Sequence, residues 1–214
     1  MNVAVVGANG QIGKHLIKLL QNSKDHTPRA VVRKEEQAKS FQDEKIETAL
    51  VDLEDTVDQI AKGLDGVDAV VFTAGSGGHT GSDKTLLIDL DGAVKTMEAA
   101  SQSRIERFIM VSALQAHHRE NWNESIKPYY TAKHFADKGL EQSGLTYTII
   151  RPGGLLNERG TGKVAAAENL SRGTIPREDV AKTIFASLTE EHTYNRGFDL
   201  VSGNDPIEQA VKKI

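Results

Sequence analysis

The sequence predicts an α/β fold in which a doubly wound, mainly parallel sheet carries helices on both of its faces. Short apolar runs of strand length alternate with amphipathic helical patterns from one end of the chain to the other. The run nearest the N-terminus leads directly into a glycine-rich turn and then into a helical pattern. Parallel strands need long crossover connections, usually helices, so this alternation places helices on both sides of one sheet.

Composition and charge limit the classes of function. The chain has 214 residues, of which 38% are hydrophobic and 26% charged, and this is typical of one globular domain spanning residues 1–214. Its net charge of −4 gives no electrostatic reason to expect nucleic acid or an anionic membrane as a partner. Because the sequence has no cysteine, thiolate chemistry and cysteine-ligated metals are excluded, and we predict no metal site. No apolar run reaches the length of a membrane span, and the first strand begins too early for a signal peptide, so we expect a cytoplasmic protein.

The first predicted strand spans residues 3–6 and ends at three glycines spaced three residues apart. Gly7 permits the tight turn, Gly10 lets the backbone approach a pyrophosphate, and Gly13 lets helix and strand pack closely. The free amides at the start of the following helix, with the positive end of its dipole, would hold the phosphates. Strand, glycine turn and helix together predict a Rossmann-type dinucleotide site.

The spacing of this motif differs from the commoner GxGxxG because Asn9 stands where the second glycine would be. The alternative is a strand-to-helix turn that needs glycines for its geometry alone. We favour the dinucleotide site because both flanks of the motif are correct. The predicted phosphate-binding residues are Gly7, Asn9, Gly10, Gln11, Ile12 and Gly13.

The second strand is predicted at residues 29–33, after a turn signal at residues 27–28. In this fold an acidic residue at the end of the second strand binds the ribose of NAD, whereas an arginine accommodates the 2′-phosphate of NADP. This chain has Arg33 and then Lys34 at that position, so we predict NADP(H) as the cofactor. The alternative is a solvated charged turn, because two glutamates follow and could neutralise both cations.

The third strand, at residues 48–51, leads into Asp52 and Leu53. We expect Asp52 to accept a hydrogen bond from the adenine amino group, with Leu53 against the ring. Asp52 could also cap the helix that we predict to start near Asp55 and to stop at Gly63.

The fourth strand, at residues 69–72, continues into Thr73, Ala74 and Gly75, whose small size would let backbone lie against the far half of the cofactor. A glycine-rich polar loop at residues 76–83 follows and is a candidate mobile flap. Its His79 is more simply explained as solvated than as catalytic. A helix over residues 84–100 is predicted to bury a stripe made of Leu86, Leu90, Ala93, Met97 and Ala100.

The fifth strand, at residues 107–111, ends at Ser112 and is followed by a polar loop at residues 115–127. The adjacent pair His117 and His118 in this loop lacks a metal-ligand spacing, so we interpret it as surface. A helix then opens at a proline, and its Tyr129 and Lys133 share one face because they are four residues apart.

The last third of the chain carries a weaker pattern. We predict a sixth strand at residues 146–151, a helix at residues 178–188, a strand at residues 198–201 and a final helix from residue 206. The GTGK segment at residues 160–163 lacks the other elements of a phosphate loop. We expect residues 153–176 to form most of a small substrate region.

The chain resembles the atypical short-chain dehydrogenases/reductases, especially the NmrA-like and biliverdin-reductase-B-like proteins that bind NAD(P)H. The resemblance spans nearly the whole chain. It is carried by Gly7-Ala8-Asn9-Gly10-Gln11-Ile12-Gly13, Asp52-Leu53, Thr73-Ala74-Gly75, Ser112, Tyr129-x-x-x-Lys133, Arg151-Pro152-Gly153 and Arg177-Glu178-Asp179-Val180-Ala181.

The resemblance implies roles for three residues. Tyr129 would be the acid/base, Ser112 would orient the substrate carbonyl, and Lys133 would hold the nicotinamide ribose and lower the pKa of the tyrosine. It also adds Pro152 and Gly153 to the cofactor-binding residues. Asp89 departs from the family pattern, because many relatives have an active-site asparagine there and use it in a proton relay.

Two functions follow from the resemblance. The first is an NADPH-dependent reductase of a small carbonyl, quinone or flavin-like acceptor. The second is a protein that senses the ratio of NADPH to NADP and signals through a protein partner, as NmrA-like proteins are thought to do. The chain lacks the long C-terminal substrate domain of sugar-nucleotide epimerases, so a bulky nucleotide sugar is not expected.

Overall fold

The computed structural model describes residues 1–78 and 80–214 and shows one layered α/β domain. Within these residues the main sheet has nine strands in the order β11-β8-β10-β6-β5-β4-β1-β2-β3, beside a small two-stranded sheet, β7-β9. The strands are β1 (Asn2–Val6), β2 (Thr27–Val32), β3 (Glu47–Leu50), β4 (Ala69–Phe72), β5 (Arg107–Val111), β6 (Thr146–Pro152), β7 (Gly154–Leu156), β8 (Lys163–Ala167), β9 (Thr174–Pro176), β10 (Arg196–Ser202) and β11 (Asp205–Pro206).

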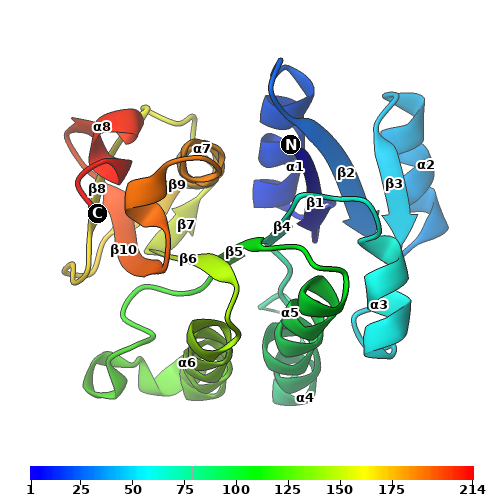
Figure 1. The fold of residues 1–214 in the computed structure, drawn as a ribbon. Helices are drawn as coiled ribbons and strands as arrows, with labels where there is room; N and C mark the ends of the chain where they lie inside the picture. The colour runs from blue at the N-terminus through cyan, green and yellow to red at the C-terminus, as the bar shows by residue number, and fades with distance from the viewer. Residues whose placement is uncertain (79) are drawn as a thin grey trace.

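Helices cover both faces of the sheet. The longer ones are α1 (Gln11–Gln21), α2 (Glu35–Asp43), α3 (Val57–Gly63), α5 (Ala93–Gln102), α6 (Lys127–Gln142), α7 (Arg177–Ser187) and α8 (Ile207–Val211), and α4 (Ser82–Lys84) leads into a π-helical segment, η1 (Thr85–Gly92). Figure 1 shows α1, α2, α7 and α8 on one side of the sheet and α3 to α6 on the other. The predicted doubly wound fold is confirmed.

Each strand of the sheet centre is buried on both faces, as its continuous apolar run predicts. In β1, for example, Val3 and Val5 pack in the core beneath α1 and α7, whereas Ala4 and Val6 pack in the core beneath α3, α5 and α6. All pairs from β3 through β6 are parallel. The strand order reverses at β1, which lies between β2 and β4, and ligands bind at such a switch point in open α/β sheets.

The structure adds elements for which the sequence gave weak signals. Helix α2 occupies the stretch for which a charged turn was the alternative interpretation. At its start the Gln37 side chain accepts the Lys34 amide at 3.2 Å, and only two of its residues, Ala38 and Phe41, are buried. The turn expected at residues 27–28 is wrong, because Thr27 and Pro28 pair with β1 as the start of β2. In the last third, β8 runs antiparallel to β10.

The helix predicted over residues 84–100 is not one regular α-helix. Its first half, η1, is π-helical, and its buried residues are Thr85, Ile88, Asp89 and Gly92. Leu86 is 50% exposed, so its place in the buried stripe was wrong. The remaining half follows the prediction, with Ala93, Met97 and Ala100 buried. Single π-turns inside helices are frequent at functional sites.

Candidate cofactor-binding and catalytic site

The turn between β1 and α1 has the geometry that the glycine motif requires. Gly7 has a φ of +86°, and a Cβ there would lie 2.7 Å from the backbone of Ala74. A Cβ on Gly13 would lie 2.5 Å from the carbonyl oxygen of Gly7, so this glycine allows α1 to approach β1. Gly10 is the N-cap of α1, which has no side-chain cap and no acidic residue in its first turn. The first amides of α1 are therefore available to an anion.

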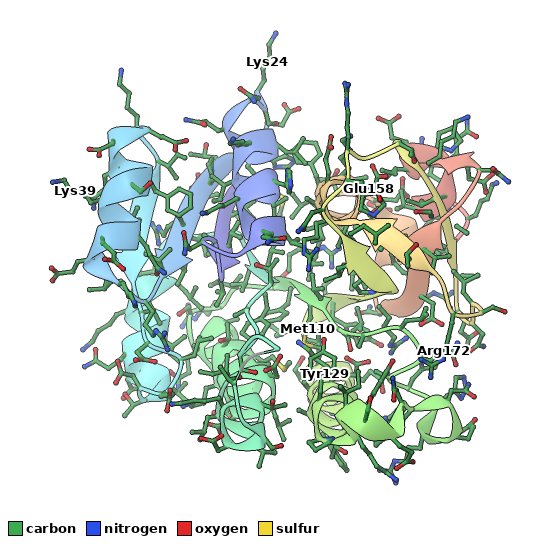
Figure 2. The ribbon with its side chains drawn as sticks, turned by 180° about the vertical axis from the view of Figure 1, so that it is seen from behind. Lys24, Lys39, Met110, Tyr129, Glu158 and Arg172 are labelled. Atoms are coloured by element: carbon green, nitrogen blue, oxygen red, sulfur yellow. The ribbon has the colours of Figure 1, made fainter. Side chains whose placement is uncertain are left out.

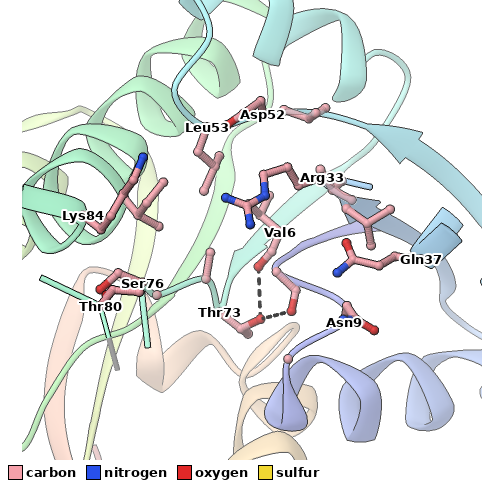
Figure 3. A pocket seen from close by; sticks show the side chains of 18 residues that line it. Val6, Asn9, Arg33, Gln37, Asp52, Leu53, Thr73, Ser76, Thr80 and Lys84 are labelled. Carbon is pink, nitrogen blue, oxygen red and sulfur yellow. Dashed lines mark hydrogen bonds between the residues drawn. The ribbon is translucent and has the colours of Figure 1, made fainter. Parts of the chain in front are cut away.

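A first cavity of about 490 Å³ lies between this turn and the ends of β2, β3 and β4. Figure 3 shows the Arg33 side chain extending over it, with Gln37 on one side and Leu53 on another. Its lining contains Gly7, Asn9, Gly10, Arg33, Asp52, Leu53, Thr73, Ala74 and Gly75, all predicted cofactor-binding residues. Their roles stay predictions, but the fold brings them to one place.

Some predictions at this end of the site need refinement. Lys34 does not line the first cavity, and its Nζ lies 3.6 Å from Glu36 on the exposed start of α2. Asp52 does not cap α3, because Thr56 is the N-cap residue, and Asp52 instead accepts the Glu54 amide at 3.0 Å. Sequence reasoning missed Lys84, which also lines the cavity.

Lys84 and Gln37 also line the first cavity, where the fold places them from two different elements. The Lys84 ammonium pairs with Glu54 at 2.6 Å, so it connects the start of the η1 segment with the chain after β3. Gln37 lines the cavity because it lies in the first turn of α2. The Gln37 side chain accepts the amide of Lys34, the N-cap residue of α2. A prediction of this capped helix from the sequence would have placed Gln37 in its first turn, beside the cavity.

A second cavity of about 700 Å³ continues from the first. The two share Gly10, Thr73, Ala74, Gly75, Ser76 and Thr80. The second cavity is also lined by Gln11, Ile12, Asp89, Ser112, Tyr129, Lys133, Leu155 and Arg177. The structure thus brings the three predicted catalytic residues to one cavity that opens from the glycine turn.

Helix α6 presents Tyr129 and Lys133 to this cavity from one face, as their spacing predicts. Tyr129 lies near the middle of the molecule, where α6 meets the sheet (Figure 2), and the Lys133 ammonium lies 5.7 Å from the centre of its ring. Ser112 follows β5 directly, and its amide donates to the Ile150 carbonyl at 2.8 Å, which continues the pairing with β6. The serine is 2% exposed.

Asp89 holds Lys133 in place. One carboxylate oxygen lies 3.3 Å from the Lys133 ammonium, and the other accepts the Ser76 amide at 3.0 Å. The ammonium also donates to the Val111 carbonyl at 3.3 Å. Asp89 lies on the buried side of the π-helical segment η1. The resemblance implied an asparagine at this position in many relatives. In this chain the Asp89 carboxylate pairs with Lys133 instead.

The surroundings of Tyr129 keep it protonated. Burial raises the pKa of Tyr129, the Lys133 ammonium opposes this, and the nearby negative charge of Asp89 raises the pKa further. The Lys133 ammonium does lower the tyrosine pKa, as expected, but burial, the largest cause, and then Asp89 outweigh it, so the net shift is upward. Burial works against the charged form of Lys133, but Tyr129 and Asp89 together raise its pKa. At neutral pH the site holds a phenol beside an ammonium–carboxylate pair.

A second buried ion pair lies behind Ser112. The Arg151 Nε donates to Asp137 Oδ2 at 2.8 Å, and both side chains are at most 3% exposed. The other oxygen of Asp137 and the hydroxyl of Ser112 have no hydrogen-bond partner within the described part of the chain. Burial raises the pKa of Asp137, and the neighbouring Arg151 guanidinium opposes that rise. Asp137 follows Lys133 by four residues, so Tyr129, Lys133 and Asp137 share one face of α6.

Other predicted residues lie outside the two cavities. Pro152 and Gly153 are in neither lining, and the Gly153 amide donates to Leu200 at 2.9 Å. Of residues 153–176, which we expected to form most of the substrate region, Leu155 lines the second cavity. His79 lies outside the described residues.

The two histidines His117 and His118 are tied to a neighbouring loop. Their Nε2 atoms lie 3.0 and 2.6 Å from one oxygen of Asn169. Across residues 1–78 and 80–214, the structure has no group of three potential metal-ligating side chains.

The same residues include no helix with the length and apolar character needed to span a membrane.

The GTGK segment has a structural use. The amides of Gly160, Thr161 and Gly162 donate to the carboxylates of Glu178 and Asp179 at 2.7, 2.8 and 3.0 Å. These carboxylates from the start of α7 occupy the amides of the loop, so the loop binds an internal anion.

Comparison with known proteins identifies the family. A family model described as NAD(P)H-binding matches residues 7–191. The chain belongs to the NAD(P)H-binding family. This match includes the glycine turn, both cavities and α6, and it confirms the resemblance inferred from the motifs.

Three relatives of this NAD(P)H-binding protein cover its whole length. The Bacillus subtilis protein YhfK, described as an uncharacterized sugar epimerase, is 62% identical over 214 residues, which is 100% of each chain. The solved structure of an NAD-dependent epimerase/dehydratase-like protein from Bacillus halodurans is 41% identical, with a TM-score of 0.94 and 100% of both chains covered. The oxidoreductase ylbE from Lactococcus lactis is 34% identical, with a TM-score of 0.91, over 100% of this chain and 96% of the other. These relatives place the chain among oxidoreductase- and epimerase-like enzymes.

Proposed function

We propose that this protein is an NADP(H)-dependent reductase that acts on a small carbonyl, quinone or flavin-like acceptor. The observation that carries the proposal is the position of Tyr129, which lines the second cavity together with Ser112 and the Lys133–Asp89 pair. A reductase needs a proton donor beside its acceptor, and a phenol with a raised pKa keeps its proton at neutral pH.

The residues of the first cavity suit a dinucleotide. The glycine turn leaves space and free amides for a pyrophosphate, and Leu53 and Asp52 border the space where an adenine would lie. The Arg33 guanidinium extends over the same space and would bind a 2′-phosphate. When bound, the reduced nicotinamide supplies a hydride to the acceptor.

The chain's own side chains then act on the acceptor oxygen. Ser112 donates a hydrogen bond to the oxygen as negative charge develops on it, and Tyr129 transfers its phenolic proton to that oxygen. The Lys133 ammonium stabilises the phenolate that remains, and Asp89 keeps the ammonium oriented. Proton exchange with water then returns Tyr129 to its neutral form. Lys133 is also placed to bind the nicotinamide ribose, since it lines the second cavity.

Preference for NADP(H) is tested at Arg33. We expect Arg33→Ala to weaken binding of NADPH by roughly 1.5–3 kcal/mol, because a charge-assisted contact with the 2′-phosphate is lost. Binding of NADH should barely change, and isothermal titration calorimetry measures both. Lys34→Ala is the matched control, because Lys34 lies outside the first cavity beside Glu36. Equal losses of NADPH and NADH affinity, or tighter NADH binding by the parent protein, would contradict the proposed preference.

Reductase activity is tested with a panel of quinones, flavins and small carbonyl compounds, by following the loss of NADPH absorbance. We expect at least one class to be reduced with saturable kinetics. Tight binding of NADPH without oxidation across the panel would overturn the reductase and favour the alternative, a redox sensor that acts through a protein partner. No binding of either nucleotide would contradict both functions.

A further inference from the structure

Arg177 lies at the start of α7 and lines the second cavity with Tyr129 and Ser112. One terminal nitrogen, Nη1, donates to the Leu155 carbonyl at 3.1 Å and to the Asn157 amide oxygen at 2.7 Å. These two contacts fix the guanidinium from one side. Its Nε and Nη2 make no hydrogen bond with any residue that the structure describes. A fixed guanidinium with unused donors at a cavity is prepared for a planar anion.

The acidic residues next to Arg177 in sequence are engaged elsewhere. Glu178 accepts the Gly160 amide at 2.7 Å and pairs with Lys182 at 2.7 Å. Asp179 is fully buried and accepts the amides of Thr161 and Gly162. Within the described residues, therefore, no carboxylate forms an ion pair with Arg177. Its positive charge stays uncompensated at the wall of the cavity.

The remainder of the second cavity sets the character of the acceptor. Its other charged lining residues, Lys133 and Asp89, pair with each other at 3.3 Å. Arg177 therefore leaves the described lining with one net positive charge. Ile126, Pro128 and Leu155 supply an apolar wall in the same cavity. An apolar or aromatic body with one anionic group matches this combination of charge and surface.

We propose that Arg177 binds a carboxylate on the acceptor, so that the preferred substrates are acidic carbonyl or quinone compounds. This inference rests on the proposed reductase function for its kinetic consequence, although binding of the anion does not depend on turnover. A guanidinium can form two parallel hydrogen bonds to a carboxylate, which orients the acceptor as well as holding it. Arg177 is thus a residue that determines specificity.

The kinetic test compares a charged aldehyde with an uncharged analogue that carries one additional methyl group, 4-carboxybenzaldehyde and its methyl ester. In Arg177→Gln we expect kcat/KM for the acid to fall by about 10- to 100-fold, which is the loss of a charge-assisted contact. The value for the ester should change little. Arg159→Gln is the matched control, because Arg159 is exposed on the same region and lines neither cavity. Equal losses for acid and ester, or no preference for the acid in the parent, would overturn the proposal.

A binding experiment separates this proposal from the reductase function. Calorimetry measures benzoate and benzamide binding to the NADP-saturated protein, and it measures NADPH binding to each variant. Benzoate binding that is stronger than benzamide binding and is lost in Arg177→Gln supports the anion site, even if no aldehyde is reduced. Absence of benzoate binding, or a loss of NADPH affinity in Arg177→Gln, would overturn it, since the second result assigns Arg177 to the cofactor phosphates.

Discussion

Replacing Tyr129 by Phe is expected to lower kcat for active acceptors by about 10²–10⁴-fold, the usual contribution of a positioned general acid. The change removes one oxygen and leaves the ring, so packing in the second cavity is kept. NADPH affinity should be unchanged, because Lys133, Asp89 and the glycine turn remain in place. Stopped-flow or steady-state oxidation of NADPH measures the first quantity, and calorimetry measures the second.

The pH profile gives an independent check of this role. Tyr129 donates its proton only while it is a phenol, and burial with Asp89 raises its pKa above the ordinary value of about 10. Turnover should therefore stay level through neutral pH and fall only in the alkaline range above the ordinary tyrosine pKa. A decline that begins near neutral pH would contradict a buried phenol as donor.

Tyr130 supplies the matched control for Tyr129. It is 7% exposed and stacks on Trp122 with ring centres 6.0 Å apart, and it does not line either cavity. Tyr130→Phe should therefore keep parental turnover. Full activity in Tyr129→Phe together with a loss in Tyr130→Phe would transfer the proton donor to the neighbouring residue.

The order of the fold was predictable because its signals are local. Buried parallel strands appear in the sequence as continuous apolar runs. Both ends of β1, β4 and β5 lie within about one residue of the predicted ends. The glycine motif likewise encodes a turn whose geometry depends on the absence of side chains. These features are fixed by neighbours in the sequence.

The less regular parts depend on contacts distant in the sequence. Helix α2 has only two buried side chains, so its apolar pattern is too sparse to distinguish it from a charged turn. Strand β8 is held by pairing with β10 and β11, which follow it by tens of residues. The π-helical winding of η1 gives no periodic signal in the sequence, and the pairing of Asp89 with Lys133 could be found only from the fold.

The site was predicted in part for the same reason. Helical spacing alone placed Tyr129 and Lys133 on one face, and the same step of four residues would have led to Asp137. The partner of Asp137 could not be found in this way, because Arg151 lies on a strand that only the fold places beneath α6. Arg177 belonged to a recognised motif, but its position at the second cavity required the structure.

A large loss of stability is expected from Arg151→Met. This change leaves the Asp137 carboxylate buried without its cation, and breaking a buried pair in this way typically costs about 3–5 kcal/mol. We expect that decrease in the free energy of unfolding at pH 8, measured by urea titration with the fluorescence of Trp122, the only tryptophan in the chain.

The pH dependence of this loss has a defined sign. Burial already raises the pKa of Asp137 in the folded protein, and Arg151 opposes the rise. Without the arginine the folded-state pKa rises further above the unfolded value of 3.8. A raised carboxyl pKa contributes stability at low pH that is lost as pH increases through the folded-state value. The deficit of Arg151→Met should therefore be smaller at pH 5 than at pH 8.

A double variant separates the buried charge from packing. Asp137→Leu combined with Arg151→Met replaces both charged groups by apolar side chains of similar size, and such replacements of a buried pair are often close to neutral. The double variant should therefore regain most of the stability that the single variant loses. If both lose stability equally, the cost arises from packing around Arg151 and not from an uncompensated carboxylate. Recovery of stability in the double variant would instead show that each buried charge of the Asp137–Arg151 pair is tolerated only because the other is present. The pair lies directly behind Ser112.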